Sequence, residues 1–235
     1  MDKKYIFVAC AMRREADLLI KEMNDVVIDD FLNFKIYVGT VLDKPIIVGV
    51  SGPGLINMSS MVSIVCFKYD VNFIINYGMV GGYGENIHKH DLIIGTECMN
   101  CNSYVTSSLE NGIDIYSWNF ITFSDGGTDE LVVYKSNDRL LNVTSSIKNF
   151  NVHYGRIGSA DVWNNEFEMI NMLMSRYNII CEDMEAVAVY QVSEMFKIPC
   201  ISIKGVSDNR FCGEEYDDTV IPILVNYVFN FIKFS

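Results

Sequence analysis

The sequence alternates between continuous apolar runs and amphipathic segments, and this alternation restricts the fold more than any other feature. Apolar runs rich in Val, Ile and Phe are typical of strands buried on both faces, and they predict strands at residues 4–11, 34–38, 46–50, 72–77, 91–96 and 199–206. Segments with helical spacing predict helices at 14–23, 55–69, 166–177, 184–196 and 220–234. Strands that alternate with helices predict an α/β fold, with a mostly parallel sheet and helices around it.

Length and composition fit one globular domain. The chain has 235 residues, of which half are hydrophobic and 20% are charged, so it is long enough to bury a full core. No linker, repeat or low-complexity tract divides it, and we predict a single domain over residues 1–235. Residues 103–137 are less regular, and we expect strands and loops inserted there at the edge of the sheet.

Charge and hydropathy argue against two classes of partner. The net charge is −12 with no run of Lys or Arg, whereas proteins that bind nucleic acid carry a basic patch. No apolar stretch reaches the ~20 residues that cross a bilayer. The apolar run at 5–12 fits a first strand better than a signal peptide, because charged residues follow it at once. We therefore predict a cytoplasmic protein without a nucleic-acid or membrane partner.

The cysteines do not indicate a metal site. There are seven, and most lie in apolar runs, a pattern typical of reduced thiols in a cytosolic protein. Cys98 and Cys101 form a CxxC, but no second pair and no His pair stands at the spacing that zinc requires. We predict no metal and no cofactor.

Three predicted strands end in residues suited to a ligand, which in parallel α/β sheets binds outside the carboxyl ends of the strands. Glu15 follows the first strand, although a carboxylate there is also explained by the dipole of the next helix. A glycine turn with Pro53 follows the third strand. Residues 75–84 contain four glycines, which let a backbone approach a ligand closely. They lack the GxxxxGK[ST] pattern of a nucleotide P-loop, so we expect a loop that lines a substrate site.

Three later side chains suggest nucleoside chemistry. Trp163 offers a flat face that stacks on a base. Glu185 precedes small apolar residues and needs hydrogen-bond donors, such as two sugar hydroxyls. Asp208 leaves the last predicted strand, and apolar surroundings raise the pKa of a carboxyl, so an acid there holds its proton near neutral pH. Each also has an ordinary explanation, as a core aromatic, a helix-start acid or a turn Asp.

Taken in order, these pieces resemble the purine nucleoside phosphorylase superfamily, and most of all its 5′-methylthioadenosine/S-adenosylhomocysteine nucleosidases. The matching stretches are AMRRE at 11–15, SGPG at 51–54, NYGMVGG at 76–82, SADVW at 159–163, EDMEA at 182–186 and SD at 207–208. The resemblance implies a three-layer α/β/α fold around a twisted, mostly parallel mixed central sheet. It also implies a homodimer, a purine nucleoside as the small-molecule substrate, and a place in methionine salvage.

The resemblance further implies hydrolysis of the N-glycosidic bond of an adenine nucleoside through an oxocarbenium-like transition state. Asp208 would protonate N7 of the leaving purine, and Glu15 would orient or deprotonate the attacking water. Glu185 would hold the ribose hydroxyls, Met184 would pack on the sugar, and Trp163 would lie against the base. The full expected set has Asp208 and Glu15 as catalytic residues and, as substrate-binding residues, Glu185, Met184, Trp163, Met79, Gly78, Ser207, Met12, Pro53, Asp183 and Lys204.

Some positions depart from the nucleosidase pattern and leave alternatives open. Met79 stands where a Ser commonly helps to hold the water, Lys204 where an Arg is usual, and Asn164 where an apolar residue is usual. A phosphorolytic enzyme is the first alternative, with Arg13 or Arg14 binding phosphate. A weakly active relative that only binds nucleosides is the second. The 5′ substituent is undecided, and so is the choice between adenine and hypoxanthine, because Asp208 could serve either base. We expect the pocket of the 5′ substituent to use Met12, Pro53 and residues 104–123, with a contribution from a partner subunit.

Overall fold

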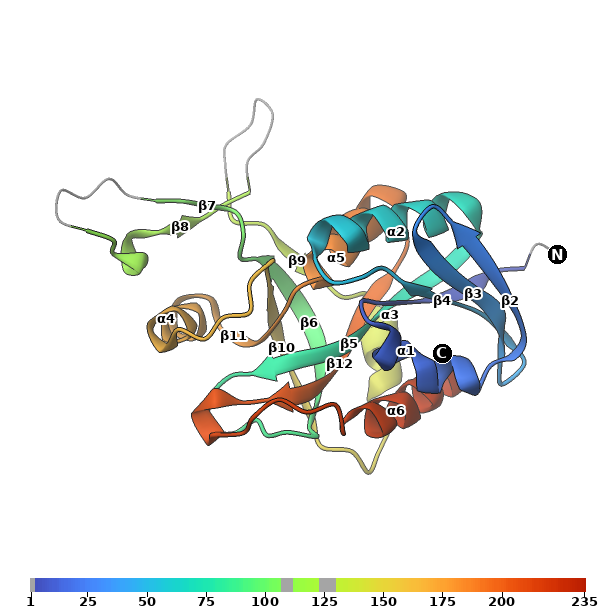
Figure 1. Cartoon of the computed structure of the whole chain (residues 1–235). Coiled ribbons are helices and arrows are strands. Elements are labelled where there is room, and N and C mark those ends of the chain that lie inside the picture. The colour runs from blue at the N-terminus through green and yellow to red at the C-terminus, as the bar shows by residue number, and fades with distance from the viewer. Residues whose placement is uncertain (1–2, 107–111, 123–129) are drawn as a thin grey trace.

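A ten-stranded sheet runs through the computed structural model, which describes residues 3–106, 112–122 and 130–235 (Figure 1). Along the sheet the order is β11-β10-β6-β12-β5-β1-β4-β3-β2, with β9 paired to β6. The strands are β1 Tyr5–Cys10, β2 Asn24–Phe31, β3 Phe34–Val41, β4 Lys44–Val50, β5 Val71–Gly82, β6 Leu92–Asn100, β9 Val133–Lys135, β10 Val152–Ser159, β11 Ile179–Asp183 and β12 Cys200–Asp208. A separate two-stranded sheet joins β7 Tyr104–Val105 to β8 Asn119–Phe120.

The sheet is mixed. Among the described residues, five of its strand pairs are parallel and five are antiparallel. The prediction of a mixed α/β sheet is confirmed, but the parallel pairs do not outnumber the antiparallel ones. Tight turns cause part of this difference, because the short links from β2 to β3 and from β3 to β4 force antiparallel neighbours.

The long strand β5 connects the two halves of the sheet. It pairs with β1 and β12 along its length, and its far end pairs with β11. The sheet therefore curls back on itself through β5, β12, β6, β10 and β11. At this closure Gly81 has Asp208 as its partner in β12 and Glu182 as its partner in β11.

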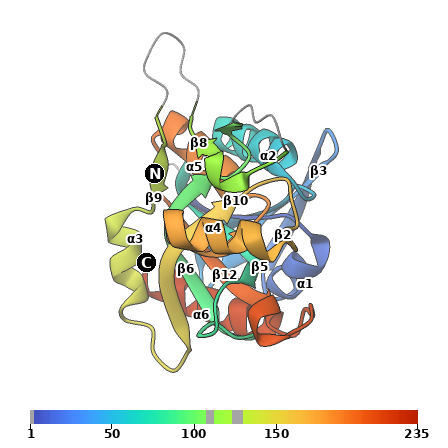
Figure 2. The ribbon, with the colours of Figure 1, turned by 90° about the vertical axis from the view of Figure 1, so that its left-hand side faces the viewer.

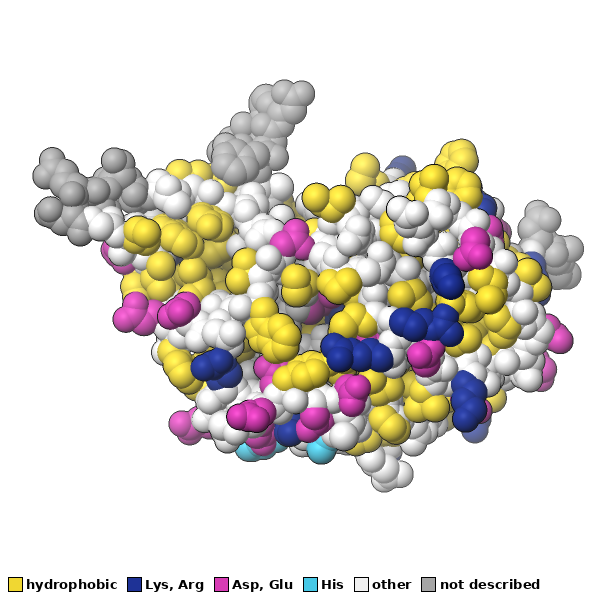
Figure 3. Space-filling view, in the orientation of Figure 1, with side chains coloured by type: hydrophobic (Ala, Val, Ile, Leu, Met, Phe, Trp, Pro, Cys, Tyr) yellow, Lys and Arg dark blue, Asp and Glu magenta, His cyan; other side chains and the backbone are white. Residues whose placement is uncertain are grey.

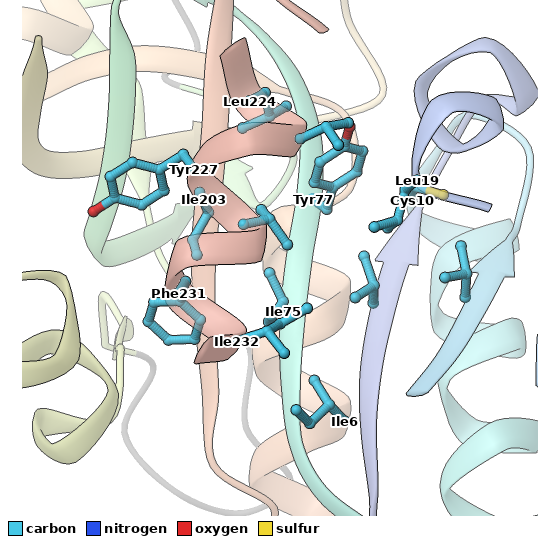
Figure 4. Packing of buried hydrophobic residues seen from close by; sticks show 14 of the residues in the cluster. Ile6, Cys10, Leu19, Ile75, Tyr77, Ile203, Leu224, Tyr227, Phe231 and Ile232 are labelled. Carbon is cyan, nitrogen blue, oxygen red and sulfur yellow. The ribbon is translucent and has the colours of Figure 1, made fainter. Parts of the chain in front are cut away.

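Helices cover both faces of the sheet. On one face α1 Arg13–Lys21, α3 Asp138–Thr144 and α6 Ile221–Phe234 pack on it. Figure 4 shows Leu224, Phe231 and Ile232 of α6 against Ile75 and Ile203 of the sheet. The opposite face is covered by α2 Leu55–Lys68 and α5 Ala186–Phe196.

A smaller third cluster lies at the curled end of the sheet. There α4 Phe167–Tyr177 contributes Ile170, Met172 and Leu173, which pack with Tyr83 and Phe120. Figure 2 shows α4 lying in front of β10 and β6. In the described part of the chain, no helix is both long enough and apolar enough to cross a bilayer.

Most of the predicted elements are present, with shifted ends. The residues 75–84, predicted as a loop, continue β5 as far as Gly82. The helix predicted from 184 begins at Ala186, because Glu185 is its N-cap residue. Unpredicted elements are α3, β2, β10, β11 and the 3₁₀ turn Arg210–Cys212. Residues 103–137 contain β7, β8, β9 and the 3₁₀ turn Ile115–Ser117, as expected of strands and loops, while 107–111 and 123–129 lie outside the described residues. The prediction of one domain over 1–235 stays a prediction.

Candidate active site

An open cavity lies where several strands end. It holds about 770 Å³ of empty space, part of it open to solvent, which is within the range of small-molecule sites. Its walls come from the segments after β1, β4 and β10, from α1 and from the ends of β5, β11 and β12. The lining residues are Ala11, Met12, Arg14, Glu15, Pro53, Met79, Val80, Gly81, Val162, Trp163, Glu182, Asp183, Met184, Glu185, Ser207, Asp208 and Tyr216.

Glu15 is fixed at the floor of the cavity by backbone donors. One carboxylate oxygen accepts a hydrogen bond from the N–H of Met12 (2.8 Å), and the other accepts one from the N–H of Met79 (3.0 Å). The residue is only 2% exposed. Burial raises the pKa of the Glu15 carboxyl, while the two backbone donors and Lys204 act in the opposite direction. A buried carboxylate held at both oxygens is a well-oriented proton acceptor.

Gly78 makes room for that carboxylate. A side chain at position 78 would place its Cβ 2.9 Å from Oε1 of Glu15, a separation too short for a non-bonded contact. Gly78 itself does not line the cavity. The glycine expected to bind substrate therefore acts on the cavity only through Glu15.

Glu185 projects from the N-terminus of α5. Its Oε1 accepts a hydrogen bond from the N–H of Gly54 at 2.9 Å, which ties α5 to the glycine turn before α2. Burial raises its pKa to about 7, Asp183 adds to the rise, and Lys204 and the Gly54 N–H oppose it. A buried carboxylate with one protein donor has capacity left for donors from a ligand.

Lys204 and Asp183 form a buried ion pair behind the cavity wall. The ammonium lies 2.7 Å from Oδ2 of Asp183, with side chains 2% and 1% exposed. Asp183 also accepts hydrogen bonds from the N–H groups of Glu185 and Ala186, so it binds backbone donors at the start of α5. Burial disfavours the charge of Lys204, but Asp183, Glu185 and Glu15 outweigh it and raise the pKa of the ammonium.

This pair corrects one expectation. Lys204 was expected to bind substrate, yet it does not line the cavity and is 1% exposed. Its position inside β12, between three carboxylates, explains why: the ammonium compensates their charge from within the protein. Asp183 does line the cavity, but its oxygens face Lys204 and the α5 backbone.

Asp208 stands at the end of β12, beside Ser207. The hydroxyl of Ser207 donates to its Oδ1 at 2.6 Å. Burial raises the pKa of the Asp208 carboxyl, and the Ser207 hydrogen bond, Arg210 and Lys89 counteract this only in part. A carboxyl with a raised pKa is suited to donate a proton.

Apolar side chains form the rest of the cavity. Met12, Pro53, Met79 and Met184 line it together with Trp163. The indole is 58% exposed and makes an edge contact with the ring of Tyr216 at 5.6 Å between centroids. A half-exposed aromatic at the mouth of a cavity leaves its face free for a flat ligand.

Ten of the twelve predicted site residues thus line one cavity, and Gly78 and Lys204 lie behind it. Their chemical roles stay predictions. Seven lining residues were not in the predicted set: Ala11, Arg14, Val80, Gly81, Val162, Glu182 and Tyr216. For Glu182 a signal existed, because it belongs to the acidic stretch 182–185, but its place in a strand was not recognised.

The basic residues considered for phosphate differ in availability. Arg13 pairs with Asp17 and contacts the hydroxyl of Tyr37, so its guanidinium is engaged away from the cavity. Arg14 lines the cavity and lies over the ring of Tyr216. On the face shown in Figure 3, Lys and Arg side chains form a short row near α1, in contrast to the broad basic surface of nucleic-acid-binding proteins.

One group among the described residues has the composition of a metal site. His88, Cys212 and Glu214 bring their donor atoms within 4.8 Å of one another. Glu214 already accepts from the N–H of Lys89, and His88 Nδ1 lies 3.0 Å from its other oxygen. None of the three lines the cavity.

Comparison with known proteins identifies the family. The model of the phosphorylase superfamily matches residues 5–226. The 5′-methylthioadenosine/S-adenosylhomocysteine nucleosidase of Haemophilus ducreyi is 26% identical over 210 residues, 88% of this chain and 85% of that relative. A DeoD-type purine nucleoside phosphorylase of Actinobacillus succinogenes is 28% identical over 189 residues, 80% of this chain and 73% of that relative.

A solved structure agrees with the fold. The nucleosidase of the same name from Neisseria meningitidis, in complex with methylthio-immucillin-A, has a TM-score of 0.80 at 22% identity, covering 98% of this chain and 99% of that one. The match of the family model confirms the resemblance drawn from the six sequence stretches. With a family model matching nearly its whole length, the chain belongs to the phosphorylase superfamily.

Proposed function

We propose that this protein hydrolyses the N-glycosidic bond of an adenine nucleoside, 5′-methylthioadenosine or S-adenosylhomocysteine, and releases adenine. The observation that carries the proposal is the convergence of Asp208, Glu185 and Glu15 on one cavity from three different elements. The names of the two nucleosidases reported above give these two nucleosides as their substrates, and this chain matches both proteins over most of its length.

The purine leaves as a neutral base in the proposed reaction. Asp208 donates its proton to N7 as the bond between C1′ and N9 breaks, and the bonding electrons remain on the base. Its raised pKa supports this role, because an ordinary aspartic acid is ionised at neutral pH. Ser207 orients the carboxyl through its hydrogen bond to Oδ1. Proton donation of this kind contributes about 10² to 10⁴ to the rate.

The sugar is held and attacked on the other side of the cavity. Glu185 accepts hydrogen bonds from the ribose hydroxyls, and its negative charge stabilises the positive charge that develops at C1′. Met184, next to it in the wall, packs on the sugar. Glu15 orients a water molecule and accepts its proton as the oxygen bonds to C1′. Trp163 stacks on the base, and Met12 and Pro53 face the 5′ group.

The proposal extends to assembly and location. We propose a cytoplasmic homodimer that acts in methionine salvage. Exposed apolar side chains on two adjacent helices, Ile56 and Phe67 of α2 and Met195 of α5, are each more than three-quarters exposed in the single chain. Burying such side chains against a second copy is favourable. Light scattering coupled to size-exclusion chromatography measures the mass directly.

The test is base release from 5′-methylthioadenosine, S-adenosylhomocysteine, adenosine and inosine, each with and without phosphate. The proposal expects adenine at the same rate in both conditions, and loss of release in Asp208→Asn. Release only with phosphate would make the protein a phosphorylase, with Arg14 as the first residue to test. Binding without any release would leave a protein that binds nucleosides.

A further inference from the structure

Glu182 is a second carboxyl in the base region of the cavity, and the proposed reaction does not use it. It lines the cavity with Asp208 and Trp163. Its Oε1 accepts a hydrogen bond from the N–H of Asn164 at 2.8 Å, and its Oε2 accepts one from the hydroxyl of Tyr83. Each oxygen is thus anchored by one donor, and each has capacity for another.

The sheet places Glu182 opposite Asp208. Both residues pair with Gly81 of β5, one from β11 and one from β12. Residues directly paired across neighbouring strands point to the same face, and two strand spacings separate their Cα atoms by about 10 Å. Gly81 between them has no side chain, and a Cβ there would lie 3.4 Å from the Asp208 carboxylate. A flat ligand over Gly81 therefore has one carboxyl at each end.

The two ends of a purine differ in what they offer. When Asp208 is at N7 of the five-membered ring, the atoms that reach toward Glu182 are those of the six-membered ring. A 6-aminopurine presents an N–H donor beside the acceptor N1, and a 6-oxopurine presents an oxygen acceptor beside the donor N1–H. An ionised carboxylate only accepts, whereas a neutral carboxyl donates and accepts. The neutral form of Glu182 matches adenine, and the ionised form matches the N1–H of hypoxanthine.

We propose that Glu182 recognises the six-membered-ring edge of the purine and extends the substrate range of this site to 6-oxopurine nucleosides. This inference rests on the proposed function, because it assumes that Asp208 faces N7. It assigns a specificity-determining role to a residue that is outside the proton-transfer steps.

Both forms of Glu182 are accessible near neutral pH. Burial raises the pKa of its carboxyl to about 7; the hydrogen bonds from Tyr83 and Asn164 oppose the rise, and the charges of Asp208 and Asp183 add to it. Two thiols, those of Cys101 and Cys181, also interact with Glu182. Together with the four groups just named, they are the titratable and polar neighbours of its carboxyl among the described residues. Base preference should therefore change with pH.

The experiment compares kcat/KM for 5′-methylthioadenosine and its 6-oxo analogue 5′-methylthioinosine across pH 5.5 to 8.5. We expect the ratio of oxo to amino substrate to rise about tenfold or more across a titration centred near neutrality. Glu182→Gln presents an N–H and a C=O that fit either base and do not titrate, so its ratio should stay constant with pH. Glu168→Gln, an exposed change on α4, is the matched control and should behave like the unchanged protein.

A ratio that does not change with pH in the unchanged protein would overturn the inference, and so would the same change of the ratio in Glu182→Gln. Cleavage of 5′-methylthioadenosine without any cleavage of the 6-oxo analogue would also overturn it, and would leave the proposed function intact. If neither nucleoside is cleaved, and S-adenosylhomocysteine is not cleaved either, the proposed function fails. In that case, calorimetry of free adenine and free hypoxanthine tests Glu182 without turnover. If the affinities for the two bases depend on pH in the same way in the unchanged protein and in Glu182→Gln, the role of Glu182 is refuted.

Discussion

Replacing Lys204 by Met removes the cation that compensates three buried carboxylates. The methionine side chain fills a similar space, so the change deletes charge more than volume. Asp183 then loses the ammonium 2.7 Å from its Oδ2 while it stays almost fully enclosed. We expect a large loss of stability together with a change in the titration of the active site.

The magnitude follows from the burial of the pair. Removing one partner of a buried ion pair costs about 3–5 kcal/mol. Asp183 keeps its hydrogen bonds from the N–H groups of Glu185 and Ala186 at the start of α5, which favours the lower end of that range. Because about 1 kcal/mol shifts Tm by roughly 2–4 °C in a protein of this length, Lys204→Met should lower Tm by about 6–12 °C.

The assay is a double-mutant cycle by thermal and urea unfolding. Asp183→Asn, Lys204→Met and the double variant are compared, with Lys148→Met on the surface as the control. The double variant should be more stable than the sum of the single changes predicts, by about 1–3 kcal/mol. A cost below about 1 kcal/mol for Lys204→Met, or additive single changes, would refute the claim that this pair is a strongly coupled buried unit.

Lys204→Met should also change the pH dependence of catalysis, an effect that a loss of stability alone does not produce. Lys204 is one of the groups that hold down the pKa of Glu185, which burial already raises to about 7. Without the ammonium, that pKa rises further, and Glu185 is ionised only at higher pH. The pH at which kcat/KM rises should therefore be higher in Lys204→Met and unchanged in Lys148→Met. An unmoved profile would show that Lys204 does not act on Glu185.

Three further measurements test the site. Gly78→Ala would place a Cβ 2.9 Å from Glu15 Oε1 and displace that carboxylate. Because a small misplacement of a catalytic group costs up to about 10²-fold in rate, steady-state kcat should fall steeply with KM little changed. An unchanged kcat would contradict the role of Glu15. In the unchanged protein, kcat/KM should rise between pH 6 and 8 as Glu185 ionises, and a flat profile would argue against a carboxylate on the ribose. Trp163→Ala should weaken nucleoside binding by about 1–3 kcal/mol, measured by calorimetry, whereas Trp163→Phe should retain most of the affinity; equal losses would exclude stacking.

The parts of the site that the sequence could predict are those where one buried strand ends. Glu15 and Asp208 each lie where an apolar run stops, and the carboxyl ends of strands are where ligands bind. Glu185 was recognisable because a carboxylate before a small apolar helix needs donors. These inferences require only the order of residues along the chain and the direction of a strand.

The parts that could not be predicted depend on pairing between distant segments. Strand β2 is mostly exposed, so it lacks the alternation that marks a half-buried strand. Strand β11 has only five residues, too few for a periodic signal. Lys204 had a usable signal, a cation inside the continuous apolar run 199–206, which predicts a buried partner. Its identification as Asp183 needed the fold.

Glu182 shows most clearly why the fold was required. In the sequence it is one of three acids before a helix, and for Glu182 and Asp183 the helix dipole is a sufficient explanation. Because β11 pairs with the end of β5, the chain from residue 182 is brought beside Gly81, and β12 brings Asp208 to the other side of the same glycine. Alternation along β11 then turns Asp183 toward Lys204 and leaves Glu182 on the cavity wall with the base region. The antiparallel pairing of β11 with β5 thus gives two adjacent acids different roles: Asp183 is structural, and Glu182 is a candidate for base recognition. A substitution that weakens this pairing should change base preference before it affects proton transfer at Asp208.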